Sequence, residues 1–195
     1  MLVKVRISVK GEESDREIQM SDRRQRRMCI RDKLSTYRDL KPANIGFDSL
    51  RCVKIFDFGL ALQLSKDEAC IGQAGTLRYM APEVAASSDK AYGLSADVFS
   101  FAVLLWEIVT SRVPYKAEIS TFTETTPQVD GIRPQLKYVK SKDLQLLLEK
   151  SWASTPDDRP KFAEIGVELH KIISTQLSKL DGEPQKKEKQ GQPQR

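Results

Sequence analysis

A short stretch of the sequence holds Asp39, Lys41 and Asn44, and a second aspartate, Asp57, opens the triplet Asp-Phe-Gly thirteen residues after Asn44. A carboxylate can accept a proton, and an ammonium group can place positive charge beside an anion. Carboxylate and amide oxygens are hard ligands of the kind that Mg²⁺ requires. These residue types suit chemistry on a phosphate group. A solvated surface loop of Asp and Lys accounts for none of the spacings.

Three motifs follow one another along the chain. They are Tyr-Arg-Asp-Leu-Lys-Pro-Ala-Asn at 37–44, Asp-Phe-Gly at 57–59 and Ala-Pro-Glu at 81–83. This ordered series resembles the signature of the eukaryotic protein kinases, in which a catalytic loop, a D-F-G and an A-P-E occur in this order. Strand-like residues before the D-F-G and an apolar helix after the A-P-E supply the context that a single short motif lacks.

The resemblance implies a reaction, its cofactors and a role for each candidate residue. A phosphoryl group would move from ATP, with Mg²⁺ as the metal, to a hydroxyl of a protein substrate. Asp39 would accept the proton of that hydroxyl, and Lys41 would stand beside the transferring phosphate. Asn44 and Asp57 would bind Mg²⁺ and, with Lys41, hold the nucleotide.

The substrate class can be taken one step further from the same resemblance. The Lys-Pro pair at 41–42 and Thr76 resemble the serine/threonine kinases. Tyr79 with its following methionine, and residues 97–107, resemble the tyrosine-kinase-like branch. We therefore expect a tyrosine-kinase-like serine/threonine kinase that acts in signalling.

Three charged residues outside the motif core are expected to support the site. By resemblance, Asp97 holds the backbone of the catalytic loop, and Arg159 pairs with Glu83 of the A-P-E.

Tyr37 stands where most kinases have histidine. The sole histidine, His170, is expected on the surface or in packing, so neither a serine–histidine hydrolase nor a histidine-ligated zinc site is predicted.

Arg38, directly before Asp39, suggests control by phosphorylation, because an arginine can receive a phosphate group. Between Asp57 and Gly75 the one hydroxyl-bearing residue is Ser65. Ser65 is therefore the predicted acceptor, and wild-type activity in a Ser65→Ala chain would remove the hypothesis.

The predicted fold is mainly α-helical with short β-hairpins, that of the carboxy-terminal lobe of a protein kinase. Strand patterns at 45–48 and 52–56 flank a turn, and residues 59–82 have no strong period and are predicted as a long loop. Residues 95–110 are apolar on almost every side, which places this helix at the centre of the domain, with Ser95 as its cap.

Two further helices are predicted from apolar spacing. One follows Ser141, and the other begins at Pro160, which is tolerated at a helix start. Their core-facing residues are Leu144, Leu147, Leu148 and Trp152 in the first and Phe162, Ile165, Leu169, Ile172, Ile173 and Leu177 in the second.

The chain divides into three segments. Residues 1–33 are a basic segment unlike a kinase with a short strand pattern over 2–10, residues 34–177 are the kinase domain, and residues 178–195 are a polar tail predicted to be disordered. None of the ten glycines forms G-x-G-x-x-G, and residues 7–10 resemble only faintly the strand that ends in the ATP-pairing lysine. The amino-terminal lobe is therefore expected to be absent or vestigial.

An incomplete catalytic domain would need another kinase, or an amino-terminal lobe supplied in trans, as a partner. The alternative is a non-catalytic kinase-like module that docks substrates or a second kinase. An uncovered lobe face would also expose apolar surface.

Charge and cysteine content exclude other classes. The net charge of +5 comes from the flanks, because residues 1–33 carry ten basic and six acidic side chains, residues 178–195 carry five and three, and residues 34–177 carry seventeen and eighteen. A nucleic-acid-binding domain places its positive patch on the folded body, so nucleic acid is not an expected partner.

The longest apolar run, 101–106, is too short to span a membrane. Three cysteines without metal spacing favour a reduced, cytoplasmic protein.

Overall fold

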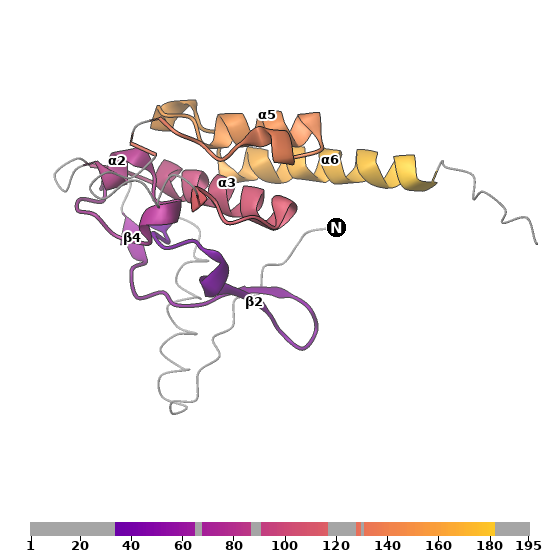
Figure 1. Ribbon diagram of the computed structural model, residues 1–195. Helices are drawn as coiled ribbons and strands as arrows, with labels where there is room; N and C mark the ends of the chain where they lie inside the picture. Colours follow the sequence, from indigo (N-terminus) through magenta and orange to yellow (C-terminus); the bar gives the residue numbers. More distant parts are fainter. Residues whose placement is uncertain (1–33, 65–67, 87–90, 117–127, 130, 182–195) are drawn as a thin grey trace, which may run out of the picture.

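The computed structural model describes residues 34–64, 68–86, 91–116, 128–129 and 131–181 of the chain. The predicted strand at 2–10, the basic segment, Ser65 and most of the polar tail lie outside the described residues. The elements, with η for a 3-10 helix, are β1 (Leu34–Thr36), η1 (Pro42–Asn44), β2 (Ile45–Phe47), β3 (Val53–Ile55), β4 (Leu62–Leu64), η2 (Leu77–Tyr79), α2 (Pro82–Ala85), α3 (Ser95–Thr110), η3 (Leu136–Tyr138), α5 (Lys142–Ser151), η4 (Pro156–Asp158) and α6 (Phe162–Asp181). Figure 1 shows the long helices grouped together, with the β2–β3 hairpin extending away from them.

Helix α3 runs through the middle of the helical part and carries most of its core. Phe99, Ala102 and Val103 are each 0% exposed, and the helix contacts α5, η2 and η4. The prediction of a central apolar helix over 95–110 is confirmed as far as Trp106, whereas Ile108 and Val109 near its end are 61% and 43% exposed. Its predicted cap is wrong, because Ser95 lies inside the first turn and the capping position is Leu94, which makes no side-chain hydrogen bond.

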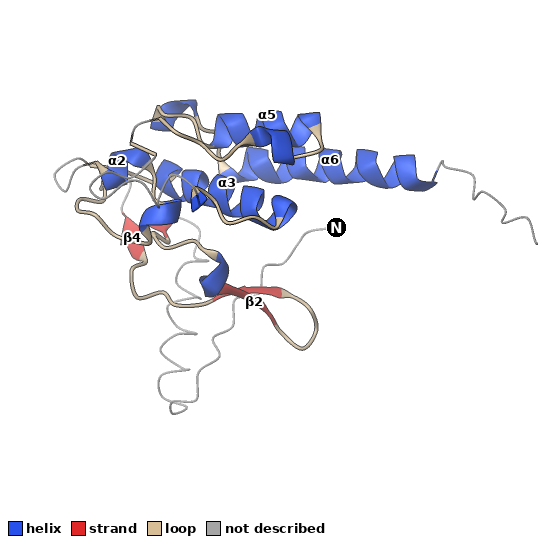
Figure 2. Cartoon of the chain, in the orientation of Figure 1, coloured by secondary structure: helices blue, strands red, loops and turns tan. Residues whose placement is uncertain are grey.

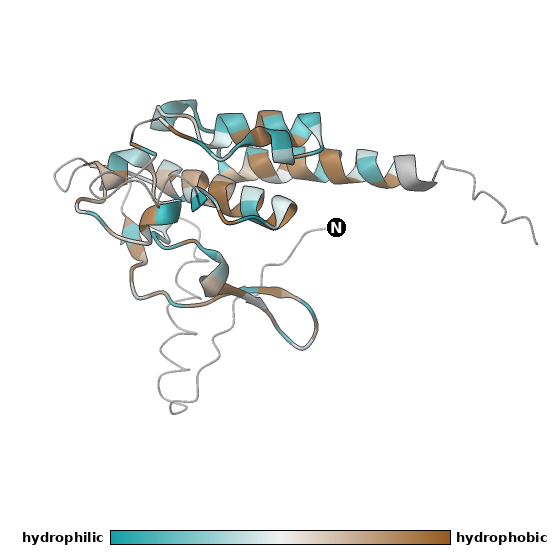
Figure 3. Cartoon of the chain, viewed as in Figure 1, coloured by the Kyte–Doolittle hydropathy of each residue, from teal (hydrophilic) through white to brown (hydrophobic). Residues whose placement is uncertain are grey.

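Helices α5 and α6 pack beside α3, and both were predicted. The Oγ of Ser141 accepts a hydrogen bond of 3.3 Å from the backbone nitrogen of Leu144 and caps α5. Leu148 of α5 and Ile165 of α6 are fully buried. Figure 3 shows brown, hydrophobic residues along α3 and α6, and teal, hydrophilic residues on α5.

The predicted core stripe of α6 is wrong at both ends, and at the first of them Phe162 is 44% exposed. Ile173 and Leu177 are each 55% exposed, and the helix continues to Asp181, so it includes the first four residues of the predicted polar tail. The last turns of α6 extend past α3 and α5 in Figure 1. Ile172, the residue directly before Ile173, is 7% exposed and packs with Val98 of α3 and Leu147 of α5. The buried face of α6 at this level is therefore the one that carries Ile172, and helical spacing alone placed Ile173 and Leu177 in the core incorrectly.

The short strands form two antiparallel pairs, drawn in red in Figure 2. In the predicted hairpin, β2 pairs with β3 so that Ile45 lies opposite Ile55. The carboxylate of Asp48 closes the turn by accepting hydrogen bonds from the backbone nitrogens of Leu50 and Cys52, at 2.9 and 2.8 Å.

The second pair, β1 with β4, corrects the prediction of one long loop over 59–82. Thr36 lies opposite Leu62 in this pair, and η2 and α2 also fall within the predicted loop. Strands of three residues are too short to show a period of two, so the sequence carried no usable signal for β4.

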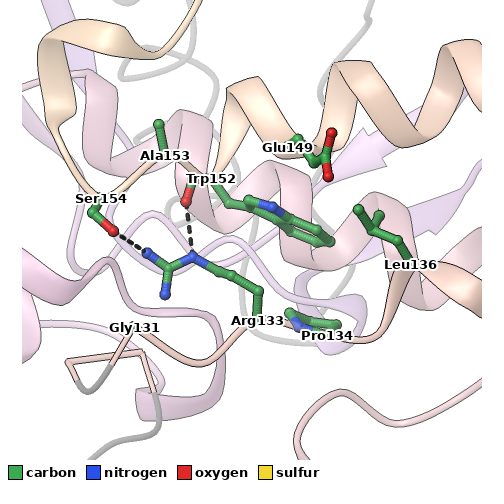
Figure 4. Close-up of a pocket in the computed structure, with 8 residues that line it drawn as sticks. All are labelled: Gly131, Arg133, Pro134, Leu136, Glu149, Trp152, Ala153 and Ser154. Carbon is green, nitrogen blue, oxygen red and sulfur yellow. Dashed lines mark hydrogen bonds between the residues drawn. The ribbon is translucent and has the colours of Figure 1, made fainter.

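A hollow of about 380 Å³ opens beside the end of α5 and is crossed by Arg133 (Figure 4). The Nε of Arg133 donates to the carbonyl of Trp152 at 2.8 Å, and its Nη2 donates to Ser154 Oγ at 3.1 Å. Its guanidinium also lies 4.9 Å from the ring centroid of Phe99. Arg133 therefore satisfies the carbonyl group of Trp152, which α5 leaves free at its carboxy-terminal end.

No helix in the described ranges is long and apolar enough to cross a membrane.

Candidate active site

The buried carboxylate of Asp97 fixes the backbone that leads into the site. Its Oδ2 accepts hydrogen bonds from Thr36 Oγ1 at 2.8 Å and the backbone nitrogen of Tyr37 at 2.6 Å, and its Oδ1 accepts one from the backbone nitrogen of Arg38 at 2.8 Å. Burial raises the pKa of Asp97, and these hydrogen bonds offset part of the rise. Arg38 has φ of +72°, a left-handed conformation that non-glycine residues rarely adopt. The predicted contact of Asp97 with the catalytic-loop backbone is confirmed.

The turn at Arg38 presents Asp39 to three hydrogen-bond donors. Lys41 Nζ lies 2.8 Å from Asp39 Oδ2, and Asn44 Nδ2 donates to the same oxygen at 3.0 Å and to the Asp39 carbonyl at 2.9 Å. Thr76 Oγ1 donates to Asp39 Oδ1 at 2.6 Å and accepts a hydrogen bond from Lys41 at 2.8 Å. The structure thus brings three of the four predicted site residues together and adds Thr76 from a distant part of the chain.

These donors set the protonation state of Asp39. Burial alone would raise the pKa of its carboxyl group, but hydrogen bonds from Lys41, Thr76 and Asn44 together outweigh burial and hold the pKa below its ordinary value. An ionised carboxylate has about four acceptor positions, of which three are used here. One acceptor position of Asp39 is not used by any described residue.

The fourth predicted residue, Asp57, lies outside this hydrogen-bonded cluster. It is exposed, its φ is +51°, and its Oδ1 accepts a hydrogen bond of 3.1 Å from the backbone nitrogen of Gly59. The hydroxyl of Tyr37 donates to the carbonyl of Phe56 next to it. Burial raises the pKa of Tyr37, and the charges of Asp39 and Asp57 add to the rise, so both carboxylates act on one hydroxyl.

The donor set fits Mg²⁺, which is bound in proteins through one or two carboxylates and completes its shell with waters and substrate phosphates. Asp57 offers a carboxylate whose Oδ2 makes no hydrogen bond to another described residue, and Asn44 offers an amide oxygen. Within the described ranges, no group of three or more His, Cys, Asp and Glu side chains is placed to hold a metal. Asn44 and Asp57 are therefore the candidate ligands.

Gly75 allows the segment that carries Thr76 to approach the catalytic loop. Its φ is +107°, and a Cβ at this position would lie 2.2 Å from the carbonyl oxygen of Arg38. No side chain fits at that separation, so only glycine brings the backbone close enough for Thr76 to reach Asp39.

Gly75→Ala is expected to lower the free energy of unfolding by about 2 kcal/mol or more, because it adds a steric clash to an unfavourable φ. Gly72→Ala (φ +88°, nothing within 4 Å) carries the φ penalty alone, and Gly93→Ala, also without a close neighbour, is the matched control. Urea unfolding should rank the losses Gly75 first, Gly72 second and Gly93 last. Equal losses for Gly75→Ala and Gly72→Ala would contradict the close approach.

The predicted pair of Arg159 with Glu83 is confirmed. Two parallel hydrogen bonds of 2.6 and 2.8 Å join the guanidinium to the carboxylate. Arg159 also donates to the carbonyls of Ala153 and Ser95, at 2.8 and 2.9 Å. The pair therefore ties α2 to the start of α3 and to the loop before η4.

Sequence reasoning missed three side chains that support the site. Thr36 donates to Asp97, Tyr92 contacts Arg38, and the Nε2 of Gln128 donates to the carbonyls of Leu77 and Arg78 at 2.7 and 2.9 Å. Each bond joins residues at least fifty positions apart. No local sequence pattern predicts hydrogen bonds between residues so far apart. Only the position of Thr36, directly before the catalytic loop, could have indicated that it supports the site.

Comparison with known proteins agrees with this geometry. Residues 29–168 match the family described as "Protein kinase domain". The chain is 39% identical over 137 residues to serine/threonine-protein kinase STY17 of Arabidopsis thaliana, covering 70% of this chain and 24% of that protein. It is 35% identical over 155 residues to STY46 of the same plant (80% and 26%), and 38% identical over 151 residues to dual specificity protein kinase shkB of Dictyostelium discoideum (74% and 22%).

The chain spans about a quarter of the length of these relatives. The family match covers more than half of the 195 residues and includes the whole cluster around Asp39. The chain belongs to the eukaryotic protein kinase family.

Proposed function

We propose that the chain carries the catalytic half of a protein serine/threonine kinase of the tyrosine-kinase-like branch, which transfers the γ-phosphoryl group of ATP to a protein hydroxyl. The observation that carries this proposal is the convergence of Lys41, Asn44 and Thr76 on Asp39, all within 3.0 Å. The names of the plant relatives, both serine/threonine-protein kinases, support the acceptor class.

Asp39 acts as the proton acceptor in the proposed reaction. The hydroxyl oxygen of the substrate forms a bond to the γ-phosphorus while the bond from that phosphorus to the ADP oxygen breaks, and the hydroxyl proton passes to Asp39. The depressed pKa of Asp39 keeps the carboxylate ionised at neutral pH, and Thr76 and Asn44 hold its orientation. Lys41, already 2.8 Å from this carboxylate, places positive charge beside the transferring group.

Asn44 and Asp57 are the residues that would hold Mg²⁺. When bound, the ion neutralises negative charge on the phosphate oxygens and so favours the transfer. The backbone nitrogen of Phe56 donates to the carbonyl of Asn44 at 2.8 Å, so the two ligand-bearing segments are joined directly.

Groups that clamp the adenine and the phosphates from above are proposed to come from an amino-terminal lobe, on a longer chain or in trans. Apolar side chains on the β2–β3 hairpin and beside Asp57 support this, because they are exposed where a second lobe would cover them. They are Phe47 (71% exposed), Leu50 (76%), Val53 (40%), Leu60 (40%) and Leu62 (41%).

The alternative function is a non-catalytic kinase-like module that docks a substrate or a second kinase. The same exposed apolar residues favour it, since they offer a contact surface. Protein is the partner in both proposals. Nucleic acid is disfavoured by the net charge of −1 over residues 34–177 (seventeen basic, eighteen acidic), and we propose the cytoplasm as the location.

The deciding experiment incubates the purified chain with labelled ATP, Mg²⁺ and a generic protein substrate, with and without a separately expressed kinase amino-terminal lobe. Labelling in either arm that depends on Asp39 supports the enzyme. No labelling in both arms, from a chain that unfolds cooperatively, supports the docking module.

Thr76 provides a prediction about pH. Thr76→Val removes the hydroxyl that donates to Asp39, so the pKa of Asp39 rises. Asp39 works only when it is ionised. As the pH is lowered, the variant therefore loses activity earlier than the wild type does, and the acid limb of the kcat/KM profile moves to higher pH. Thr76→Ser keeps the hydroxyl and should keep the wild-type limb. An unmoved limb in Thr76→Val would contradict the role of this hydrogen bond.

A further inference from the structure

Tyr92 joins two segments of the site that lie far apart in the sequence. Its hydroxyl accepts a hydrogen bond of 2.9 Å from Arg38 Nε and donates one of 3.0 Å to the carbonyl of Gly72. The guanidinium of Arg38 also lies 5.7 Å from the Tyr92 ring centroid. Tyr92 is 6% exposed, and burial raises its pKa, so the hydroxyl keeps its proton and can serve as donor and acceptor at once.

The backbone of Tyr92 also holds this segment, two residues before Gly72. Its nitrogen and carbonyl exchange hydrogen bonds of 2.9 and 2.8 Å with Cys70. The stretch from Cys70 to Thr76 is therefore hydrogen-bonded to Tyr92 and, through Thr76, to Asp39. Between these bonds, Gly75 lies close against the carbonyl of Arg38. The attachment to Tyr92 lies next to Arg38, whose backbone is already fixed by Asp97.

We propose that Tyr92 is a positioning residue, whose hydroxyl docks the segment 70–76 onto Arg38 and so places Thr76 against Asp39 without a phosphate group on that segment. This inference rests on the proposed kinase function. It offers an alternative to the role of Arg38 as a phosphate receiver, because in this structure a neutral phenol inside the chain already links the guanidinium to the segment.

The test compares Tyr92→Phe, which deletes one hydroxyl, with Tyr138→Phe as the matched control. Tyr138 is 37% exposed, and its ring contacts Trp106. Loss of two hydrogen bonds is expected to lower kcat roughly tenfold in Tyr92→Phe. The KM for ATP should stay unchanged, since the binding groups for ATP are untouched. Tyr138→Phe should match wild type in both constants.

Coupling to Thr76 separates positioning from a general loss of stability. If Tyr92 acts through Thr76, adding Tyr92→Phe to the Thr76→Val chain lowers kcat by much less than tenfold. Phosphatase treatment of the wild-type chain should leave kcat unchanged. A full tenfold fall in the Thr76→Val background, or a fall after dephosphorylation, would overturn the proposal.

Amide hydrogen exchange gives a readout that does not need activity. Peptides covering residues 68–76 should exchange several-fold faster in Tyr92→Phe than in Tyr138→Phe, because the docked segment opens more often. If the wild-type chain has no kinase activity but the two variants show this difference in exchange, the proposed kinase function is rejected and the role of Tyr92 in docking the segment 70–76 is supported. Identical exchange in the two variants would reject the docking role whatever the activity.

Discussion

Asp39→Asn is expected to lower the rate of ATP-dependent phosphorylation of a protein substrate by at least about 100-fold, the usual contribution of a positioned general base. Asparagine has nearly the same shape as aspartate, so packing around the turn at Arg38 should persist. The change replaces an ionised acceptor by a neutral amide, which cannot take the proton of the attacking hydroxyl.

The contacts of Asp39 explain why so small a change should have so large an effect. Both carboxylate oxygens are in use, Oδ1 by Thr76 and Oδ2 by Lys41 and Asn44. Whichever way the new amide turns, its NH₂ group faces donors instead of acceptors. The ion pair with Lys41 is also lost, so the lysine is released from its place beside the transferring phosphate.

Asp157→Asn is the matched control, because this aspartate is exposed and lies in η4. Initial rates at saturating ATP measure the effect, and urea unfolding of each variant checks the fold. A rate within a few-fold of wild type in a folded Asp39→Asn chain would contradict the assignment of Asp39 as the base.

The candidate site was predictable to the extent that its residues are close in sequence. Asp39, Lys41 and Asn44 fall within one loop, and a local motif reports them together. Asp57 was found by the same kind of motif, and Asp97 and Arg159 by resemblance to the family. Each of these residues was identified from its place in a short motif or from the residues next to it in the sequence.

The sequence could not report contacts between segments that lie far apart along the chain. Tyr92 reaches Arg38 across 54 positions, and neither residue stands in a periodic pattern that predicts the other. Gly75 reads as an ordinary loop glycine until its approach to the carbonyl of Arg38 is known. Both depend on where the segment 70–76 lies relative to the catalytic loop, which is a property of the tertiary structure.

The fold shows the same division. The helix α3 was predictable because few of its sixteen residues are polar. A helix that is apolar on nearly every side is stable only in the core. The strand β4 was missed because three residues carry too little pattern, and its identity depends on pairing with β1. Ile173 and Leu177 follow a helical period, but both are 55% exposed, while Ile172 next to Ile173 packs in the core.

Arg159→Ala is expected to lower the free energy of unfolding by about 3–5 kcal/mol, the usual cost of removing one partner from a buried ion pair. The side chain of Arg159 is 0% exposed and that of Glu83 is 14% exposed. The variant leaves the Glu83 carboxylate without its cation. It also removes the donor from the carbonyls of Ala153 and Ser95.

Glu83→Gln separates the ionic part of this cost from the rest. Glutamine keeps the length of the side chain and one acceptor oxygen, so Arg159 retains its backbone bonds and part of the pair. The expected loss is smaller, about 1–3 kcal/mol. In the double variant the losses should not add, because each single change already breaks the shared contact. Additive losses would contradict the pair as the source of the stability.

The exposed pair Lys171–Glu168 on α6 is the internal comparison, with side chains 65% and 45% exposed. Glu168→Gln should change the free energy of unfolding by less than about 1 kcal/mol. A loss in Arg159→Ala no larger than this would show that the buried pair is dispensable. If the free energy of unfolding falls by that much, activity should also fall in the molecules that remain folded. The reason is that Glu83 follows Thr76 by seven residues, so releasing Glu83 loosens the segment that carries Thr76 to Asp39.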